Sequence, residues 1–218
     1  EVVHAESGAM VLRFIDGKTL EPENLRDHST IQKVVSLLKK CHLEMPQNLP
    51  GSTLILWVFQ VIRGYAKTMR EGQSRMIPQL SRFMEINRQL EKTVGAVEIH
   101  FGHNDLLAGN FINDGQRLWL IDWDYAGFNS PLFDLANLAS NNEYTEILER
   151  LLLASYFEQD PTEDLWKRYF AMKCASLLRE AMWSMVSEIH STLDFDYLQY
   201  TTENLDRFEN TYAQFEKL

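Results

Sequence analysis

Four side chains able to carry a proton or bind a cation occur within one short stretch of this sequence. They are His103, Asp105, Asn110 and Asp122. Hard divalent cations such as Mg²⁺ prefer oxygen ligands, commonly one or two carboxylates together with substrate phosphates. Asn110 and Asp122 offer an amide oxygen and a carboxylate, while Asp105 can accept a proton from an attacking hydroxyl group. These are the groups that kinase-type phosphoryl transfer requires.

A β-hairpin is expected to bring these groups together. An Asp114-Gly115 pair stands between two apolar runs, which is a strong local signal for a tight hairpin turn. We predict strands over Asn110–Asn113 and Arg117–Ile121, with Asp114-Gly115 as a two-residue loop. This register places Asp122 opposite Leu107, so the proton acceptor and the two oxygen ligands converge at the open end of the hairpin.

Three motifs follow one another in this region. They are His103-Asn104-Asp105 through Asn110, Ile121-Asp122-Trp123-Asp124-Tyr125-Ala126-Gly127, and Asp134-Leu135-Ala136-Asn137. In this order and spacing they resemble the choline/ethanolamine kinase branch of the aminoglycoside-phosphotransferase-like superfamily, closest to its bacterial choline kinases. The resemblance implies a protein-kinase-like fold. It also implies a catalytic base at Asp105, Mg²⁺ ligands at Asn110 and Asp122, a brace behind the catalytic loop at Asp134, and a structural role for His103.

Simpler interpretations of the same residues stay open. A lone His-x-Asp is more often a capped turn than a catalytic loop. Asp122-Trp123-Asp124 also matches the DxD pattern of nucleotide-sugar glycosyltransferases, although no alternating strand–helix pattern precedes it. Asp124 is either a supporting group for the metal or a solvated strand end.

The first twenty residues are interpreted as part of a small lobe and its hinge. Strands are predicted over Glu1–His4 and Ala9–Ile15, joined by a Ser7-Gly8 turn. The following segment, to Leu20, resembles the family's interlobe hinge, whose backbone near Phe14 and Ile15 would hydrogen-bond the adenine of ATP. The family's Gly-rich loop and strand lysine do not occur in these residues. Either a small lobe is encoded upstream, or the protein is a remnant that holds ATP weakly.

Residues 21–218 are predicted to form a mostly helical large lobe with a small catalytic hairpin, so the fold class is α+β. A capping box at Ser29 and Gln32 predicts the first helix. Its apolar face comprises Ile31, Val34, Val35, Leu38 and Cys41. Further helices are predicted over Leu54–Met69, Ile77–Lys92, Thr145–Phe157, Asp164–Ile189 (one helix or two) and Phe195–Phe215, with a short strand over Val97–His100.

The acceptor pocket is expected at the back of the large lobe. A quaternary ammonium group has no N–H to donate, so proteins recognise it with aromatic faces and a nearby carboxylate. The resemblance implies that Trp183, Tyr197 and Tyr200 wall this pocket, although an aromatic residue on an amphipathic helix such as Trp183 is commonly core. Two positions depart from the family: Asn141-Asn142 replaces a Glu-Trp pair, and Val186 replaces a second tryptophan.

Composition restricts the partners and the compartment. The net charge of −10 argues against nucleic acid or an anionic membrane as the main partner. Cys41 and Cys174 are too few for a disulfide framework and suggest reduced, buried thiols in a cytoplasmic protein. The most apolar run, Leu54–Ile62, is far shorter than the about 20 residues that span a bilayer. The sequence does not indicate an oligomeric state.

The resemblance implies an ATP- and Mg²⁺-dependent kinase. It would transfer the γ-phosphoryl group to the hydroxyl of a small cationic alcohol, choline or ethanolamine. One alternative is a phosphotransferase of the same fold that acts on an aminoglycoside or another hydroxyl compound. The other is a catalytically deficient pseudokinase that binds a cationic ligand or a protein partner.

Overall fold

The long helix α7 (Glu163–His190) organises the helical part of the chain. In the computed structural model, which describes residues 2–218, α7 packs against α3 (Val58–Glu71), α4 (Leu80–Val94), α5 (Pro131–Asn141) and α8 (Tyr197–Phe215). Apolar residues occur on most sides of α7, so the helix is buried along much of its length. Of the two predicted possibilities for this segment, the single helix is confirmed.

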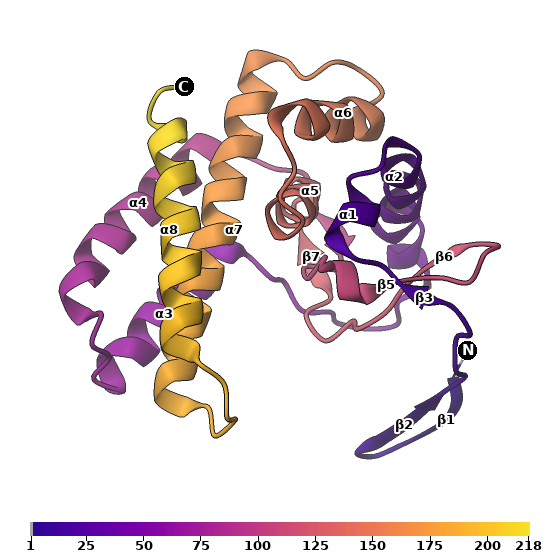
Figure 1. The fold of residues 1–218 in the computed structure, drawn as a ribbon, viewed down its shortest axis with the longest axis horizontal. Helices are drawn as coiled ribbons and strands as arrows, with labels where there is room; N and C mark the ends of the chain where they lie inside the picture. The colour runs from indigo at the N-terminus through magenta and orange to yellow at the C-terminus, as the bar shows by residue number, and fades with distance from the viewer. Residues whose placement is uncertain (1) are drawn as a thin grey trace.

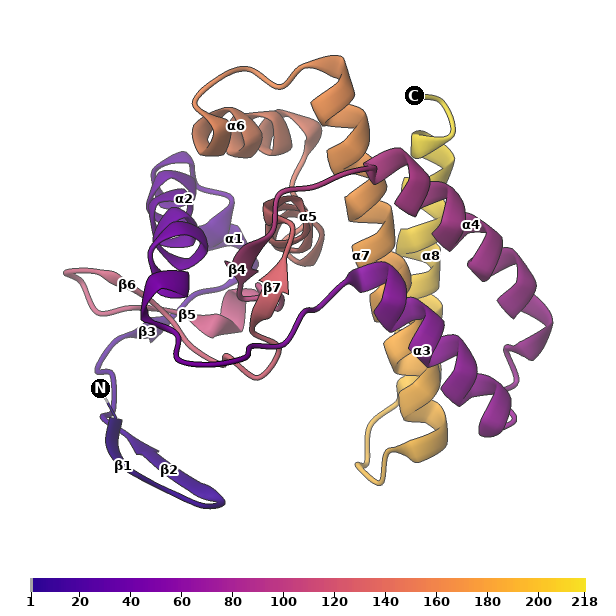
Figure 2. The ribbon, with the colours of Figure 1, turned by 180° about the vertical axis from the view of Figure 1, so that it is seen from behind.

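A second group of helices lies on the other side of α5. It consists of α1 (Pro22–Leu25), α2 (His28–Leu43) and α6 (Glu146–Phe157), and α2 contacts both α1 and α6. Figures 1 and 2 show α5 between α2 and α7 from both sides. Short 3₁₀ turns complete the helical elements: η1 (Met45–Asn48), η2 (Ile77–Gln79) and η3 (Ala108–Asn110). Because α5 is central, nearly all of its side chains are buried.

Three small sheets complete the fold. The first sheet pairs β1 (Val2–Glu6) with β2 (Ala9–Leu12). The second contains β3 (Lys18–Thr19), β5 (Phe111–Asn113) and β6 (Leu118–Leu120), in that order. The third pairs β4 (His100–Gly102) with β7 (Gly127–Asn129). All of these pairs are antiparallel. The β1–β2 hairpin extends away from the remainder of the chain in both views (Figures 1 and 2), and its apolar side chains are exposed.

The β5–β6 hairpin forms where it is predicted, but its register differs from the prediction. Asn113 pairs with Leu118, so the loop lies one residue later and Asp122 comes opposite Gly109 instead of Leu107. The physical reason is the Asp114 side chain, whose Oδ1 accepts the backbone N–H groups of Gln116 and Arg117, both at 2.8 Å. The shift moves each partner by two positions, which keeps every side chain on its predicted face.

Two predicted helix starts are wrong. Helix α2 is capped by Asp27, not Ser29: the Asp27 Oδ2 accepts the Thr30 N–H at 3.0 Å.

Helix α3 begins at Val58 instead of Leu54, because residues 54–56 are extended and pair with β7. There the Phe128 N–H donates to the Leu54 carbonyl at 2.8 Å. A Cβ at Gly127 would lie 2.8 Å from the same carbonyl, so this close approach requires glycine.

The remaining predicted boundaries are shifted by a few residues. Strand β2 ends at Leu12 instead of Ile15, and Glu1, the first residue of the other predicted strand, lies outside the described residues. The strand predicted over Val97–His100 is found at β4, three residues later. The helices predicted from Ile77, Thr145 and Phe195 are present as α4, α6 and α8. Cys41 and Cys174 are both buried and unpaired, as predicted.

No helix in the described part of the chain, residues 2–218, is long and apolar enough to cross a membrane.

Substitution of Leu178, which lies fully buried on α7, tests whether this helix organises the core. Leu178→Ala leaves a cavity among packed helices and should lower the free energy of unfolding by about 2–5 kcal/mol. The control is Leu198→Ala on α8, where the side chain is 57% exposed and the expected change is within about 0.5 kcal/mol. Urea unfolding of both variants measures the difference. Equal losses would contradict the assignment of the core to α7.

Candidate active site

A buried carboxylate at the start of α5 holds the loop that follows β4. The Asp134 Oδ2 accepts the His103 N–H at 2.9 Å, and its Oδ1 accepts the Asn104 N–H at 2.7 Å. One turn later on α5, the Asn137 Oδ1 accepts the Leu106 N–H at 2.6 Å. Residues three apart share a helix face, so α5 presents both acceptors to the same loop. The segment around Asp105 is thereby fixed from behind.

The charge of Asp134 is stabilised from α2. Burial opposes ionisation, but the hydrogen bond and charge of His42 and the backbone N–H of His103 hold the pKa of Asp134 below its ordinary value of 3.8. His42 Nε2 lies 2.9 Å from the Asp134 Oδ2, and His42 Nδ1 lies 2.6 Å from the Tyr156 hydroxyl. Because an ionised carboxylate only accepts, Nε2 of His42 carries the proton between them.

Asn104 fixes the path of the loop through its side chain. Its backbone has φ of +67°, a conformation that asparagine tolerates better than most residues. Its Nδ2 donates to the carbonyls of Tyr125 at 3.0 Å and Gly127 at 3.1 Å, and its Oδ1 accepts from Asn129 Nδ2 at 3.2 Å. Asn104 therefore ties the loop after β4 to the segment that enters β7.

His103 is enclosed by the same segments. Its ring is fully buried beside Trp123, with ring centroids 4.8 Å apart. Nε2 donates to the Ile121 carbonyl at 2.9 Å, and Nδ1 accepts the Asp105 N–H at 3.3 Å. These two partners correspond to a neutral ring with the proton on Nε2. His103 thus links the residue before Asp122 to the backbone of Asp105.

Asp105 is half-buried at the exit of this loop, between charges of both signs. Burial raises its pKa most, the charges of Glu180 and Asp122 raise it further, and the charge of Arg179 opposes the shift. A carboxyl with a raised pKa is a better proton acceptor than a solvated one once it is ionised. Below it, the Asn110 Nδ2 donates to the Asp105 carbonyl at 2.9 Å, which leaves the Oδ1 of Asn110 available as a ligand.

Asp122 lies beside Asn110 across the hairpin. The Ile121 N–H donates to the Asn110 carbonyl at 3.0 Å, and the chain then turns at Asp122, where φ is +62° and the side chain is exposed. The amide oxygen of Asn110 and the carboxylate of Asp122 fit Mg²⁺, which keeps several non-protein oxygens. Among residues 2–218, no group of three or more His, Cys, Asp or Glu side chains could hold a metal ion. Asp124 is exposed on the following turn.

The three predicted pocket aromatics lie together at one end of α7 and α8. The ring of Trp183 is 6.2 Å from the rings of both Tyr197 and Tyr200, in edge-to-face orientations. All three side chains are partly exposed, which distinguishes Trp183 from the buried core residues of α7.

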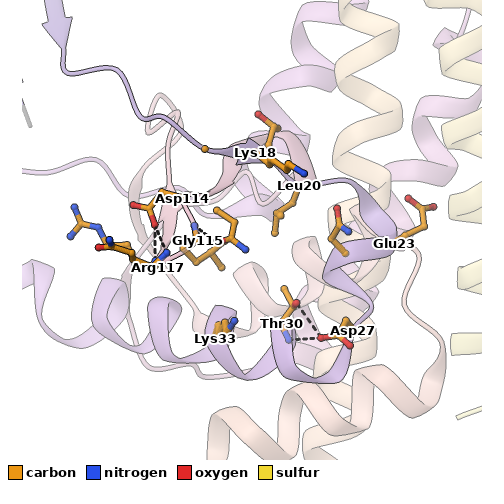
Figure 3. Close-up of a pocket in the computed structure, with 15 residues that line it drawn as sticks. Lys18, Leu20, Glu23, Asp27, Thr30, Lys33, Asp114, Gly115 and Arg117 are labelled. Atoms are coloured by element: carbon orange, nitrogen blue, oxygen red, sulfur yellow. Dashed lines mark hydrogen bonds between the residues drawn. The ribbon is translucent and has the colours of Figure 1, made fainter.

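Two hollows flank the β3–β5–β6 sheet. One, of about 550 Å³, lies between the segment 13–16, which contains Phe14 and Ile15, and the hairpin turn. The segment predicted to bind adenine therefore lines a hollow. The other, of about 740 Å³, lies between the turn and the start of α2 and contains Lys18, Lys33 and Arg117 (Figure 3). None of the predicted catalytic or metal-binding residues lines it, so we assign it no part in the site.

Comparison with known proteins decides the family. The family model for choline/ethanolamine kinases matches residues 6–149. The chain belongs to the choline/ethanolamine kinase family. It is 28% identical to a probable ethanolamine kinase of Arabidopsis thaliana, over 88% of this chain and 58% of that protein. It is 26% identical to the protein LicA of Haemophilus influenzae, over 94% of this chain and 78% of that protein.

The solved structure of a choline/ethanolamine kinase family protein from Mesorhizobium loti has the same fold. It superposes with a TM-score of 0.82 at 21% identity, over 97% of this chain and 73% of that chain. The predicted protein-kinase-like fold is therefore confirmed. The chain spans less than two thirds of the length of the Arabidopsis relative.

The end of α5 shows how this kinase-family chain accommodates the Asn141-Asn142 departure. Asn142 is fully buried, and its Nδ2 donates to the carbonyls of Leu138 at 2.8 Å and Leu106 at 3.2 Å. Asn142 thus supports the loop near Asp105 from inside. It does not present a polar group to a pocket.

Several residues that shape the site were given no individual role by the sequence patterns. They are His42, Asn104, Asn137, Arg179 and Glu180. Asn104 and Asn137 stand inside the recognised motifs, so their spacing was a usable signal. His42 contacts Asp134 across 92 positions, and no local pattern reports such a contact. Arg179 and Glu180 look like ordinary helix-surface charges until the helix is packed.

Replacement of Asp134 by asparagine tests the buried brace. Asp134→Asn removes the charge beside His42 and turns an amide N–H₂ towards a backbone donor, so the free energy of unfolding should fall by roughly 3–5 kcal/mol at neutral pH. Because the folded-state pKa is depressed, the charge stabilises the fold above pH 3.8, and this contribution is lost as the pH falls through the folded-state pKa. The difference in free energy of unfolding between wild type and variant should therefore decrease below about pH 3.8.

Urea unfolding between neutral pH and pH 3 measures this gap. The control is Asp206→Asn, because Asp206 is exposed on α8. A gap that stays constant with pH would show that the ionised carboxylate is not what stabilises the loop.

Proposed function

We propose that the protein is a kinase that transfers the γ-phosphoryl group of ATP to the hydroxyl of choline or ethanolamine with the help of Mg²⁺. The convergence of Asp105, Asn110 and Asp122 at the end of a loop held by Asp134 carries this proposal. Family membership and the probable ethanolamine kinase of Arabidopsis thaliana support the acceptor class. The two unpaired thiols support a cytoplasmic location.

Asp105 is the proposed general base. Its carboxylate accepts the proton of the acceptor hydroxyl as the oxygen attacks phosphorus in line with the leaving oxygen. The loop geometry supports this role. His103 accepts the Asp105 N–H and Asn110 donates to the Asp105 carbonyl, so both residues hold the backbone of Asp105 and not its carboxylate. A base held in one orientation reduces the entropy cost of reaching the transition state.

Asn110 and Asp122 are the proposed ligands of Mg²⁺. When bound, the ion neutralises charge on the phosphate oxygens. The backbone at Asp122 is left-handed and follows directly after the hydrogen bond from Ile121 to Asn110, and we infer that this turn brings the Asp122 carboxylate beside Asn110. The hinge backbone at Phe14 and Ile15 is the proposed adenine contact. A structure described as a LicA complex with AMP shows that a related fold binds an adenine nucleotide.

Replacement of the proposed base separates catalysis from stability. In the full-length protein, Asp105→Asn should lower kcat for choline by about a hundredfold to ten-thousandfold while nucleotide affinity is kept. Because the folded-state pKa of Asp105 is raised, its ionisation at neutral pH opposes folding, so the variant should unfold at the same urea concentration or a higher one. ADP release, nucleotide titration and urea unfolding measure the three quantities. Wild-type turnover in the variant would remove Asp105 from the mechanism.

The metal assignment is tested by the magnesium requirement. Asp122→Asn removes the proposed carboxylate ligand and should raise the Mg²⁺ concentration for half-maximal ADP release by about tenfold to a hundredfold. Asp164→Asn is the control, because Asp164 is exposed on α7 and lies outside the site. If both variants require the same Mg²⁺ concentration as the wild type, the proposed ligand is wrong.

A further inference from the structure

A hollow of about 740 Å³ beside the hairpin turn takes no part in the proposed active site. Its volume lies in the range that proteins use to bind small molecules. Its walls come from β3, α1, the start of α2 and the turn between β5 and β6. Figure 3 shows Lys18 of β3 on one side of the hollow and Lys33 of α2 on the opposite side. A ligand between them would meet ammonium groups from two different elements.

The acidic side chains around this hollow already have partners. The Asp27 Oδ2 accepts the Thr30 N–H at 3.0 Å and so caps α2. The Asp114 carboxylate accepts two backbone N–H groups of the turn, at 2.8 Å each, and the Trp119 indole N–H at 2.7 Å. Glu23 pairs with the arginine three residues later, with 3.9 Å between the charged groups. These carboxylates are therefore engaged in holding the walls together.

The two lysines have no such partners. Among residues 2–218, neither the Lys18 nor the Lys33 side chain forms a hydrogen bond or an ion pair. The remaining cation of the lining, Arg117, lies over the Trp119 ring, 3.3 Å from its centroid. A lysine ammonium only donates hydrogen bonds, and it binds phosphate as a point charge. The charges of the hollow that are left for a ligand are therefore positive.

Two amide groups add neutral donors to the same hollow. The Asn24 Oδ1 accepts the Glu21 N–H at 2.9 Å, and the Asn113 Oδ1 accepts the Gly115 N–H at 3.0 Å. Within the described part of the chain, neither amide N–H₂ group has an acceptor. Ammonium and amide donors together favour a ligand that carries negatively charged oxygens, because charge-assisted hydrogen bonds are the stronger ones.

The hairpin turn is also a wall of the hollow at Phe14 and Ile15, where adenine is proposed to bind. Asp114, Gln116 and Arg117 line both hollows. A ligand in either hollow would therefore contact the same turn. Two ligands that favour the same conformation of a shared element raise each other's affinity by the same factor.

We propose that the hollow between the hairpin turn and α2 is a regulatory site for a small diphosphate-bearing anion, which Lys18 and Lys33 bind from opposite walls. Its occupancy holds the turn in place and so tightens adenine binding in the neighbouring hollow. The anion site is independent of the proposed function, whereas its effect on adenine rests on the proposed nucleotide contact.

The opposing interpretation is that both lysines are solvated surface side chains that bind no ligand. Calorimetric titration of the full-length protein with inorganic pyrophosphate separates the two interpretations, because this probe offers one phosphate group to each lysine. The titration is made in EDTA. Without Mg²⁺ to bridge the phosphates, the carboxylates of Asp105 and Asp122 repel the anion from the proposed catalytic centre.

Wild-type protein should bind pyrophosphate saturably and inorganic phosphate at least about tenfold more weakly, because one phosphate group reaches one lysine. Lys18→Gln and Lys33→Gln should each weaken pyrophosphate binding by about tenfold to a hundredfold. Lys18→Arg keeps the charge and should retain binding. The matched control is Lys92→Gln, which removes the same charge from an exposed residue of α4 that does not line the hollow.

Adenosine reports on the coupling, because it has no phosphate to compete for the lysines. Saturating pyrophosphate should tighten adenosine binding by at least about fivefold in the wild type and have no effect in the Lys18→Gln/Lys33→Gln double variant. Without pyrophosphate, the two proteins should bind adenosine equally and unfold at the same urea concentration, since both lysines are exposed.

Pyrophosphate binding that persists in the double variant, or that falls equally in Lys92→Gln, overturns the anion site. Binding that requires both lysines but leaves adenosine affinity unchanged overturns its regulatory role. If adenosine does not bind the wild type at all, the proposed nucleotide contact is wrong, and the pyrophosphate titration still decides whether the anion site exists.

Discussion

The structure depends on one buried carboxylate accepting two consecutive backbone N–H groups. Without Asp134, the N–H groups of His103 and Asn104 would be buried with no acceptor, which costs free energy comparable to a lost hydrogen bond for each. The carboxylate in turn requires the His42 donor, since an uncompensated buried charge is far more costly. This interaction joins α2, α5 and the loop after β4, and so determines where Asp105 emerges.

The site concentrates unfavourable local features that the surrounding network offsets. Asn104 and Asp122 both have positive φ, and Asp105 is a carboxyl whose ionised form is disfavoured by burial. Each would be lost in an isolated loop, because a flexible chain would relax into a more extended, solvated conformation. The hydrogen bonds of the Asn104 side chain and the hairpin register of β5–β6 hold these features in place. The free energy that these features cost near Asp105 is offset by the packing of α5 and α7.

Sequence patterns predicted the helices and the hairpin because these depend on local periodicity and turn chemistry. They failed where a distant segment decides the outcome. Residues 54–56 are apolar and were predicted to be helical, yet they pair with β7. The hairpin turn shifts because the Asp114 side chain accepts the backbone N–H two residues ahead. At the site, the motif residues could be placed, but the contacts of His42 with Asp134 and of Glu180 with Tyr200 join separate helices and leave no local signal.

We propose that the hairpin assembles one metal-binding site from Asn110 and Asp122 beside the proton acceptor Asp105. A crystal structure of the full-length protein with Mn²⁺ in place of Mg²⁺ and a non-hydrolysable ATP analogue tests it most directly, because the anomalous signal of manganese locates the ion. We expect a manganese peak that contacts the Asn110 amide oxygen, the Asp122 carboxylate and the analogue's phosphates, with Asp105 facing the terminal phosphate. A peak bound elsewhere, or a terminal phosphate turned away from Asp105, would contradict it.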